Sequence, residues 1–538
     1  MSSSRRTFLQ QASTLGLLYS SSRAFPQMNM SHAQMSQKPS VHRNVANSSF
    51  PMLHTLELTP FVDPLPLPQI AHPTLHNGKR TLTVTMQEIH AKVHRDVPMT
   101  RMWSYGPTAL APLIEARSHE PLEITWVNNL PAKHFLPIDH SLHGCGIDIP
   151  DVRTIAHLHG AKVPSKDDGY PEDWFACGKS RTCHYPLEQE AATLWYHDHA
   201  MGINRLNTYA GLFGMFLIRD KVEGSLHLPT GKYEIPLLFY DRDFTADGQL
   251  FYNTSGDPEH PWIPEFSADG ILVNGKIRPF LEVEPRLYRF RLVNAANSRF
   301  FNLALSNGQP FTQVGSDQGF LSAPADLKLI SLAPAERADI LIDLSQSAGQ
   351  TLHFRTGALD ILELRVARQA TSPQSYSIPK TLRPVHRIAE SEATTTRTIT
   401  LHEYKDKYGM SMVMLLNRKH WHEPTTEFPK LNSTEIWEFI NLTEDTHPMH
   451  LHLVRFQILD RRPFDTEYYL RNQKLRFTAD AAPPDAQELG WKDTVQCPDS
   501  TVTRIIVRFE GYPGKYLYHC HILEHEANDM MRPFEVIA

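Results

Sequence analysis

Leu287-Tyr288-Arg289-Phe290-Arg291-Leu292-Val293-Asn294 alternates between the two faces of a strand and ends at an asparagine. The pattern recurs as Leu-Glu-Ile-Thr-Trp-Val-Asn at residues 122–128 and as Glu-Ile-Trp-Glu-Phe-Ile-Asn at residues 435–441. A period of two is typical of a half-buried strand. A second pattern occurs twice, as Ile-Leu-Val-Asn-Gly-Lys at residues 271–276 and as Met-Leu-Leu-Asn-Arg-Lys at residues 414–419. Such repetition predicts several copies of one strand-rich domain.

The rest of the chain also favours an all-β fold. Most segments are short, rich in β-branched and aromatic residues, and separated by turn residues, with 40 prolines in all. This pattern is typical of β-sandwiches. A chain of 538 residues exceeds the size of a single core. We expect three similar β-domains, at residues 49–220, 221–370 and 395–538, with a Pro/Ser/Thr/Gln-rich linker at residues 371–394.

The N-terminus has the features of an export signal. Ser4-Arg5-Arg6-Thr7-Phe8-Leu9 is a twin-arginine motif, and a weakly apolar run follows it. We expect residues 1–24 to form a signal peptide and residues 25–48 a flexible lead-in, which places the mature protein in the periplasm or outside the cell. The alternative is a chance arginine pair in a disordered terminus. The apolar run is too short to span a membrane, and no other stretch of about 20 apolar residues occurs.

Charge and cysteine content limit the function classes. The formal net charge of −6 gives no electrostatic case for binding nucleic acid or an acidic membrane. An oxidising compartment would permit disulfides among the five cysteines. Cys177 and Cys183 flank a short polar loop and are the best pair on spacing. An odd count leaves at least one thiol free, and Cys520 has a better use.

Histidine is unusually frequent, with 29 copies, and eight of them form four His-x-His pairs. One such pair on a strand commonly decorates a surface or satisfies a polar core. Four pairs, two in each terminal domain, indicate a metal centre, although imidazole suits Cu, Zn, Fe or Ni alike. The middle domain has no histidine after Asn294, so we expect it to act as a spacer. The pairs are His157/His159, His197/His199, His450/His452 and His519/His521.

The C-terminal run identifies the metal. His519-Cys520-His521 is followed by His525 and then by Met530. With His447, these residues provide two imidazoles, one thiolate and one thioether, which is the ligand set of a blue copper site. Zinc would not need the thioether. Because Cys520 lies between two histidines, an electron on its copper can leave through the backbone to either imidazole.

These runs resemble the four signature motifs of the multicopper oxidases. The similarity is greatest to the bacterial spore-coat laccase subgroup, which includes bilirubin-oxidising members, and it extends from about residue 50 to the end. It also covers Asn129–Pro137 and Asp460–Asp465. The resemblance implies three cupredoxin-like Greek-key β-sandwich domains. It also implies four copper ions, with O2 and a small electron donor as partners, and a monomeric enzyme.

The resemblance further implies a role for each residue. Type 1 copper takes His447, Cys520 and His525, with Met530 axial, and type 2 copper takes His157 and His450. One type 3 copper takes His159, His197 and His519, and the other takes His199, His452 and His521. Asp168 and Glu526 match the acids that deliver protons for O2 reduction. Alternatively, Glu526 is a surface acid or only orients His525.

The chain departs from the subgroup near the donor site. Ser267 stands where the spore-coat enzyme has a disulfide cysteine, and the partner loop after Gly357 is shortened. We therefore expect a more open donor site, with an exposed edge of His525 as the electron entry.

The predicted function is a laccase-type oxidation of phenolic, aromatic or bilirubin-like donors coupled to the reduction of O2 to water. A cuprous oxidase of copper homeostasis is the first alternative, with Met410, Met412 and Met414 as the relevant residues. A copper-free structural protein of the cell envelope would lack ligands, and none is missing. A simple electron carrier would not need eight additional histidines, and a copper nitrite reductase has a different domain plan.

Overall fold

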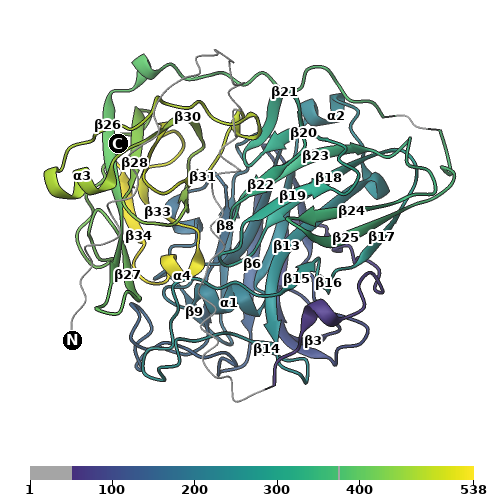
Figure 1. Cartoon of the computed structure of the whole chain (residues 1–538), viewed down its shortest axis with the longest axis horizontal. Coiled ribbons are helices and arrows are strands. Elements are labelled where there is room, and N and C mark those ends of the chain that lie inside the picture. The colour runs from purple at the N-terminus through teal and green to yellow at the C-terminus, as the bar shows by residue number, and fades with distance from the viewer. Residues whose placement is uncertain (1–50, 374–375) are drawn as a thin grey trace, which may run out of the picture.

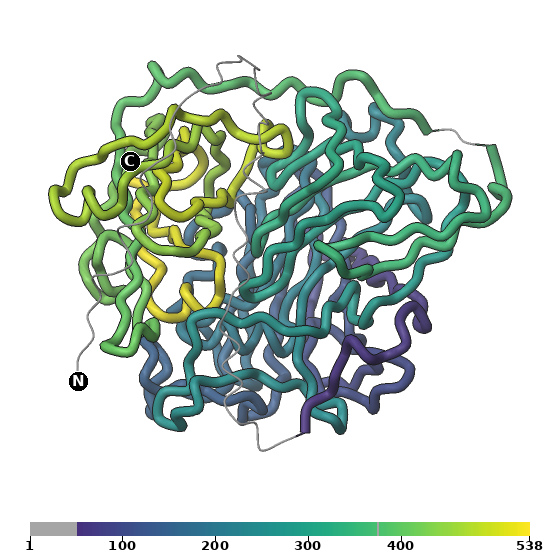
Figure 2. Tube along the Cα trace, viewed as in Figure 1, coloured from purple at the N-terminus to yellow at the C-terminus, as the bar shows by residue number. Residues whose placement is uncertain are grey.

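The computed structural model describes residues 51–373 and 376–538. The predicted signal peptide and the lead-in lie outside the described residues. Strands dominate, and within the described ranges they form six larger sheets and one two-stranded sheet. The six larger sheets make three sandwiches, and Figures 1 and 2 show the third of these, in yellow-green, beside the other two. The all-β, cupredoxin-like prediction is confirmed.

The first sandwich carries two of the histidine pairs. One sheet has the order β1 (Ile70–Ala71), β5 (Leu113–Arg117), β12 (Phe213–Arg219), β11 (Ala192–Asp198), β8 (Ala156–His159). The other has the order β10 (Ser180–Tyr185), β6 (Leu122–Asn129), β3 (Lys79–Ala91), β2 (Thr74–His76), with β4 (Thr100–Ser104) also on β3. A small sheet pairs β7 (Arg153–Thr154) with β9 (Phe175–Ala176).

The second sandwich contains none of the predicted ligands. Its larger sheet has the order β16 (Lys276–Ile277), β15 (Gly270–Val273), β13 (Glu234–Phe244), β18 (Leu287–Asn294), β23 (Arg337–Asp343), β20 (Phe311–Ser316), β21 (Gly319–Leu327), with β14 (Leu250–Phe251) on β13. Its smaller sheet has the order β17 (Phe280–Val283), β25 (Leu359–Val366), β24 (Thr351–Thr356), β19 (Phe301–Leu305), β22 (Ile330–Leu332).

The third sandwich carries the remaining ligands. One sheet has the order β27 (Ser411–Leu416), β26 (Thr395–Lys405), β28 (Thr434–Asn441), β32 (Thr501–Arg508), β30 (Phe456–Pro463). The other has the order β31 (Thr494–Cys497), β29 (His447–Leu451), β33 (Gly514–Cys520), β34 (Met531–Val536).

Helices are short and lie between strands. The α-helices are α1 (Asn204–Ala210), α2 (Lys221–Ser225), α3 (Thr466–Asn472) and α4 (Leu523–Glu526). The 3-10 turns are η2 (Thr55–Glu57), η3 (Ser165–Asp167), η4 (Gly231–Tyr233), η5 (Glu390–Glu392) and η6 (Ala486–Glu488). Across residues 51–373 and 376–538 we find no helix with the length and apolar character needed to cross a membrane.

The repeated segments are β6, β18 and β28, and the asparagine near the end of each strand makes the same kind of side-chain hydrogen bonds. Asn128, Asn294 and Asn441 each accept a hydrogen bond from the backbone N–H two residues on, at 2.9–3.1 Å. Each also donates its side-chain amide to a backbone carbonyl of a neighbouring segment. Asparagine closes the strand in this way because its short amide mimics a backbone turn.

The same three strands also join the two sheets of each sandwich. Trp126 packs on Tyr196, Phe290 on Phe354 and Trp437 on Tyr518, with ring centroids 5.2–5.5 Å apart. The expected half-burial holds for β6, whereas β18 is buried on both faces. On the face of β18 opposite Phe290 the polar positions are arginines, and Arg291 lies 2.5 Å from Glu223 and 2.7 Å from Glu234. Paired arginines explain how an alternating segment becomes fully buried.

The predicted disulfide between Cys177 and Cys183 is wrong. All five cysteines are in the described part of the chain, and none forms a disulfide there. Cys183 lies on β10 within the apolar core, whereas Cys177 is half-exposed in the turn before that strand. The two side chains therefore occupy different environments, which spacing along the chain does not reveal. At Gly357, β24 and β25 form a tight hairpin that pairs Thr356 with Leu359.

Candidate metal centres

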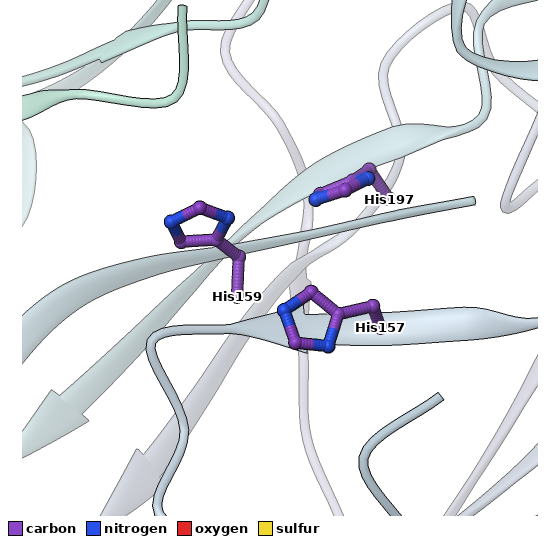
Figure 3. A group of neighbouring side chains, drawn as sticks. All are labelled: His157, His159 and His197. Atoms are coloured by element: carbon purple, nitrogen blue, oxygen red, sulfur yellow. The ribbon is translucent and has the colours of Figure 1, made fainter. Parts of the chain in front are cut away.

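The first two histidine pairs lie on adjacent strands of the first sandwich. β8 and β11 run antiparallel, and His157 lies directly opposite His197. Figure 3 shows His157 and His159 on one strand and His197 on its neighbour, with the three rings close together. On β11, Tyr196 faces the core, so the alternation of a strand turns His197 to the other side. That side faces the third sandwich.

The third sandwich presents its own histidines to the same space. His450 on β29 pairs with His519 on β33. Tyr518 packs into the core against Trp437, so His519 points outward, as His197 does. Ring centroids from the two sandwiches approach to 4.0 Å for His157 and His452, and to 3.7 Å for His159 and His450. The structure therefore brings all eight histidines of the four pairs together at one interface, and each is no more than 1% exposed.

One part of the predicted ligand grouping is wrong. His519 lies with His199 and His452, at ring-nitrogen distances of 3.4 and 3.1 Å. His521 lies with His159 and His197, at centroid distances of 5.1 and 5.2 Å. The two histidines that flank Cys520 thus exchange groups relative to the resemblance. They are only two residues apart in the chain, at the end of β33 and just after it, so the packing of the partner strands decides which set each one joins.

A separate cluster lies inside the end of the third sandwich. Cys520 follows the alternation inward, and its Sγ lies 3.5 Å from His447 Nδ1 and 3.6 Å from His525 Nδ1. Those two nitrogens are 3.2 Å apart. Thr443 Oγ1 lies 2.6 Å from His447 Nε2, which leaves Nδ1 directed at the sulfur. Met530 is buried in the same core as Cys520.

The prediction of an exposed His525 edge is wrong, because His525 is completely buried. Trp262 donates its indole N–H to the carbonyl of Glu524 at 2.9 Å, which holds the loop before β15 against α4. On another side, Asn528 exchanges hydrogen bonds with the backbone of β27 at Met412 and Met414. These two segments keep α4 covered even though the β24–β25 loop is short.

These donor sets fit metal ions. Ring nitrogens of six of the eight interface histidines are buried without a hydrogen-bond partner among the described residues: His157, His159, His197, His199, His450 and His521. Buried polar atoms are normally paired, so converging unpaired nitrogens indicate a cation site.

Burial lowers the pKa of His197, His199, His447 and His450 to about 3. The imidazoles are therefore neutral, as metal coordination requires. Burial raises the pKa of the Cys520 thiol, so a bound cation must displace its proton.

Both predicted acids contact this array. Asp168 Oδ2 lies 2.7 Å from His452 Nδ1, and its backbone carbonyl lies 2.5 Å from His157 Nδ1. Glu526 lies 3.4 Å from His199 Nε2 and 3.3 Å from His519 Nδ1. Burial raises the pKa of Asp168 well above its usual value. Burial acts in the same direction on Glu526, but the neighbouring His519 and His199 outweigh it and its pKa is lowered.

Three residues of the site were not predicted. Asp493, on the segment leading into β31, lies 3.0 Å from His159 Nε2 and contacts Arg337 and Gln318 of the second sandwich. Asp493 is an isolated acid in a mixed segment, and no local pattern marks it. Arg337 and Gln318 carry no signal either, because their partners are more than 150 residues away.

Comparison with known proteins supports one family. Residues 85–223 and 392–538 each match a family profile described as multicopper oxidase. The chain is 44% identical over 514 residues to the laccase of Bacillus stratosphericus, covering 90% of this chain and all of that one. It is also 44% identical over 511 residues to the laccase of Bacillus subtilis strain 168, covering 89% and 99% of the two chains. The chain belongs to the multicopper oxidase family.

A solved structure agrees with this assignment. The crystal structure of the laccase from Pediococcus acidilactici superposes with a TM-score of 0.74 at 27% identity, covering 88% of this chain and 94% of that one. Both profile matches fall on the sandwiches that carry the histidines. This multicopper oxidase therefore binds copper and acts as a laccase-like oxidase, with O2 and an electron donor as its reactants.

Gly160, directly after His159, provides a test of the geometry. Its φ is +86°, and a Cβ there would lie 2.6 Å from both Asp493 Oδ2 and Gln318 Nε2. Gly160→Ala must displace the carboxylate that contacts His159. Disturbing such a contact typically weakens metal binding by about 10- to 100-fold. We expect the variant to retain less copper per chain after dialysis against a chelator.

Gly178→Ala is the matched control. Gly178 has a similar φ of +76°, and a Cβ there meets nothing within 4 Å. It therefore carries the backbone strain without the clash. Equal copper retention in the two variants would contradict the prediction.

Proposed function

We propose that this multicopper oxidase holds four copper ions and couples the one-electron oxidation of phenolic and related aromatic donors to the four-electron reduction of O2 to water. The observation that carries the proposal is a pair of buried donor sets joined by one tripeptide. Cys520 belongs to the inner cluster, which it forms with His447 and His525. Its chain neighbours His519 and His521 belong to the interface cluster, the eight paired histidines between the first and third sandwiches.

The proposed ligands follow the groups described above. Type 1 copper would be held by His447, Cys520, His525 and Met530, and type 2 copper by His157 and His450. The type 3 pair would be held by His159, His197 and His521 on one side, and by His199, His452 and His519 on the other. Bound copper supplies one-electron redox chemistry at the first site and O2 reduction at the other three. All twelve ligands come from one chain, which supports a monomer as the working unit.

The chain's own groups set the conditions for this chemistry. The ligands are buried at the end of the third sandwich and between the first and third sandwiches, so bulk water is kept away from them. Reduction of one O2 consumes four protons, and Asp168 and Glu526 are the acids proposed to deliver them. Each touches histidines of the interface cluster, and Asn204 Nδ2 holds Glu526 at 2.5 Å.

We also propose the domain limits 49–220, 221–370 and 395–538. Each of these ranges contains all the strands of one sandwich.

The donor class is tested by oxygen uptake. Copper-loaded enzyme should consume one O2 for every four electrons withdrawn from a phenol such as 2,6-dimethoxyphenol and release no hydrogen peroxide. Cys520→Ser, which keeps every histidine, should abolish the uptake because it removes the thiolate that joins the two sites. Turnover of Cu(I) with no turnover of the phenol would contradict the proposal and favour the cuprous oxidase alternative.

The proton role is tested by Asp168→Asn and Glu526→Gln. Both substitutions keep the shape of the side chain and remove the acid. Loss of a positioned acid commonly costs roughly 100-fold or more, so reoxidation of the reduced enzyme by O2 should slow by about that factor in stopped-flow measurements. Anaerobic reduction of the type 1 centre should be unchanged. Asp173→Asn, an exposed acid paired with Arg181, is the control. Reoxidation at the wild-type rate in both site variants would contradict the role.

We propose export through the twin-arginine route, based on residues 4–9. Replacing both Arg5 and Arg6 by lysine should leave the folded protein in the cytoplasmic fraction, because the route reads the arginine pair. Immunoblots of periplasmic and cytoplasmic fractions measure this. Unchanged export of the double variant would contradict it.

A further inference from the structure

Arg337 of the second sandwich reaches across to the copper-site region of the third. It lies at the start of β23 and is almost fully buried. Its Nη1 donates to Asp493 Oδ1 at 2.7 Å, and its Nη2 donates to Asp493 Oδ2 at 2.5 Å. Such a two-pronged pair fixes both the position and the orientation of the carboxylate.

The remaining N–H groups of Arg337 hold the guanidinium in place. Nε donates to the carbonyl of Thr193 at 3.0 Å, Nη1 to that of Ala335 at 3.0 Å, and Nη2 to that of Asp317 at 2.9 Å. All five donors of the side chain are thus used, and they tie together segments of all three sandwiches. Arg337 is therefore a fixed support and not a mobile surface charge.

Asp493 in turn contacts histidines on both sides of the interface. Its Oδ1 lies 3.0 Å from His159 Nε2, and its backbone carbonyl lies 2.8 Å from His450 Nδ1. An oxygen at these positions makes each of those ring nitrogens the N–H donor. The other nitrogen of each ring, Nδ1 of His159 and Nε2 of His450, is buried without a partner among the described residues. Asp493 therefore determines which nitrogen each ring offers to a metal.

Asp493 converges with His159 and His450, so it could itself be a metal ligand. Its hydrogen bonds argue against this. Oδ1 accepts from Arg337, from His159 and from Thr494 Oγ1 at 3.0 Å, and Oδ2 accepts from Arg337 and from Gln318 Nε2 at 2.6 Å. Both oxygens are already saturated by donors.

We propose that Arg337 is a positioning residue for the oxygen-reducing copper cluster, and that it acts by clamping Asp493 so that His159 presents Nδ1 and His450 presents Nε2. The second sandwich is then more than a spacer, because it supplies the support that selects the donor atoms between the other two. This inference rests on the proposed function, since it needs copper at those histidines.

The experiment compares copper-loaded Arg337→Lys with the wild type. Lysine keeps the charge but loses the two-pronged geometry. We expect about 10- to 100-fold weaker retention of copper at the cluster, the usual cost of losing such a support. The electron paramagnetic resonance signal expected of the type 2 copper should weaken or shift. So should the absorption shoulder near 330 nm expected of the type 3 pair. The 600 nm band of the type 1 site should be unchanged, because that site makes no contact with Arg337 or Asp493 in the described structure.

Arg289→Lys is the matched control. Arg289 is equally buried in the second sandwich and makes the same two-pronged contact, with Asp339 at 2.8 and 2.5 Å, but it touches no histidine. It should keep all four coppers and both signals. Loss of the cluster signals in Arg289→Lys as well would overturn the proposal, because the effect would then be general destabilisation. Wild-type signals in Arg337→Lys would overturn it too.

Asp493→Asn gives a second route if Arg337→Lys fails to fold. It should cause the same selective loss, and the double variant should be no worse than Asp493→Asn alone, because Arg337 acts through Asp493. Losses that multiply would overturn the proposal. A wild-type enzyme that binds copper without type 2 or type 3 signals would contradict the proposed function instead.

Discussion

Neutral imidazoles packed together in a buried interface are the constraint on which the rest of this structure depends. Eight histidines from two sandwiches share one interface, and each is almost completely buried. Each ring has two nitrogens to satisfy, and the protein provides partners for one nitrogen in most of them. The unpaired nitrogens would cost free energy in a metal-free protein, so metal binding and docking of the two sandwiches are coupled.

The strand architecture makes this arrangement possible at little local cost. On β11 and on β33 a tyrosine faces the core and the next residue, a histidine, faces the opposite side. On β33 the alternation continues, so Cys520 returns to the inside of the third sandwich beside His447. A single run of alternating residues thereby places a thiolate in one site and an imidazole in another. The link between the two sites is one residue of backbone, and its geometry is as rigid as the strand.

The second sandwich has a structural role that its lack of ligands conceals. It supplies Arg337 and Gln318 to Asp493, and it also supplies Tyr252, Asn297 and Ser298 to Glu524, next to His525. Buried acids beside both copper-site regions are thus held by the same sandwich. Because these carboxylates are fully paired, they orient the histidine-bearing segments and do not compete for the metal.

The sequence by itself determined the strand class, the three repeats, the two histidine-bearing domains and which residues are proposed as ligands. It could do so because period two, the repeated terminal asparagine and the His-x-His spacing are local properties of the chain. Only the tertiary structure decided which histidine group His519 and His521 each join, since the two are only two residues apart in the chain. It likewise decided that His525 is buried, that Cys177 and Cys183 stay apart, and that Asp493 accepts two hydrogen bonds from Arg337. Each of these outcomes is set by contacts between segments distant in the sequence, where no local pattern carries the information.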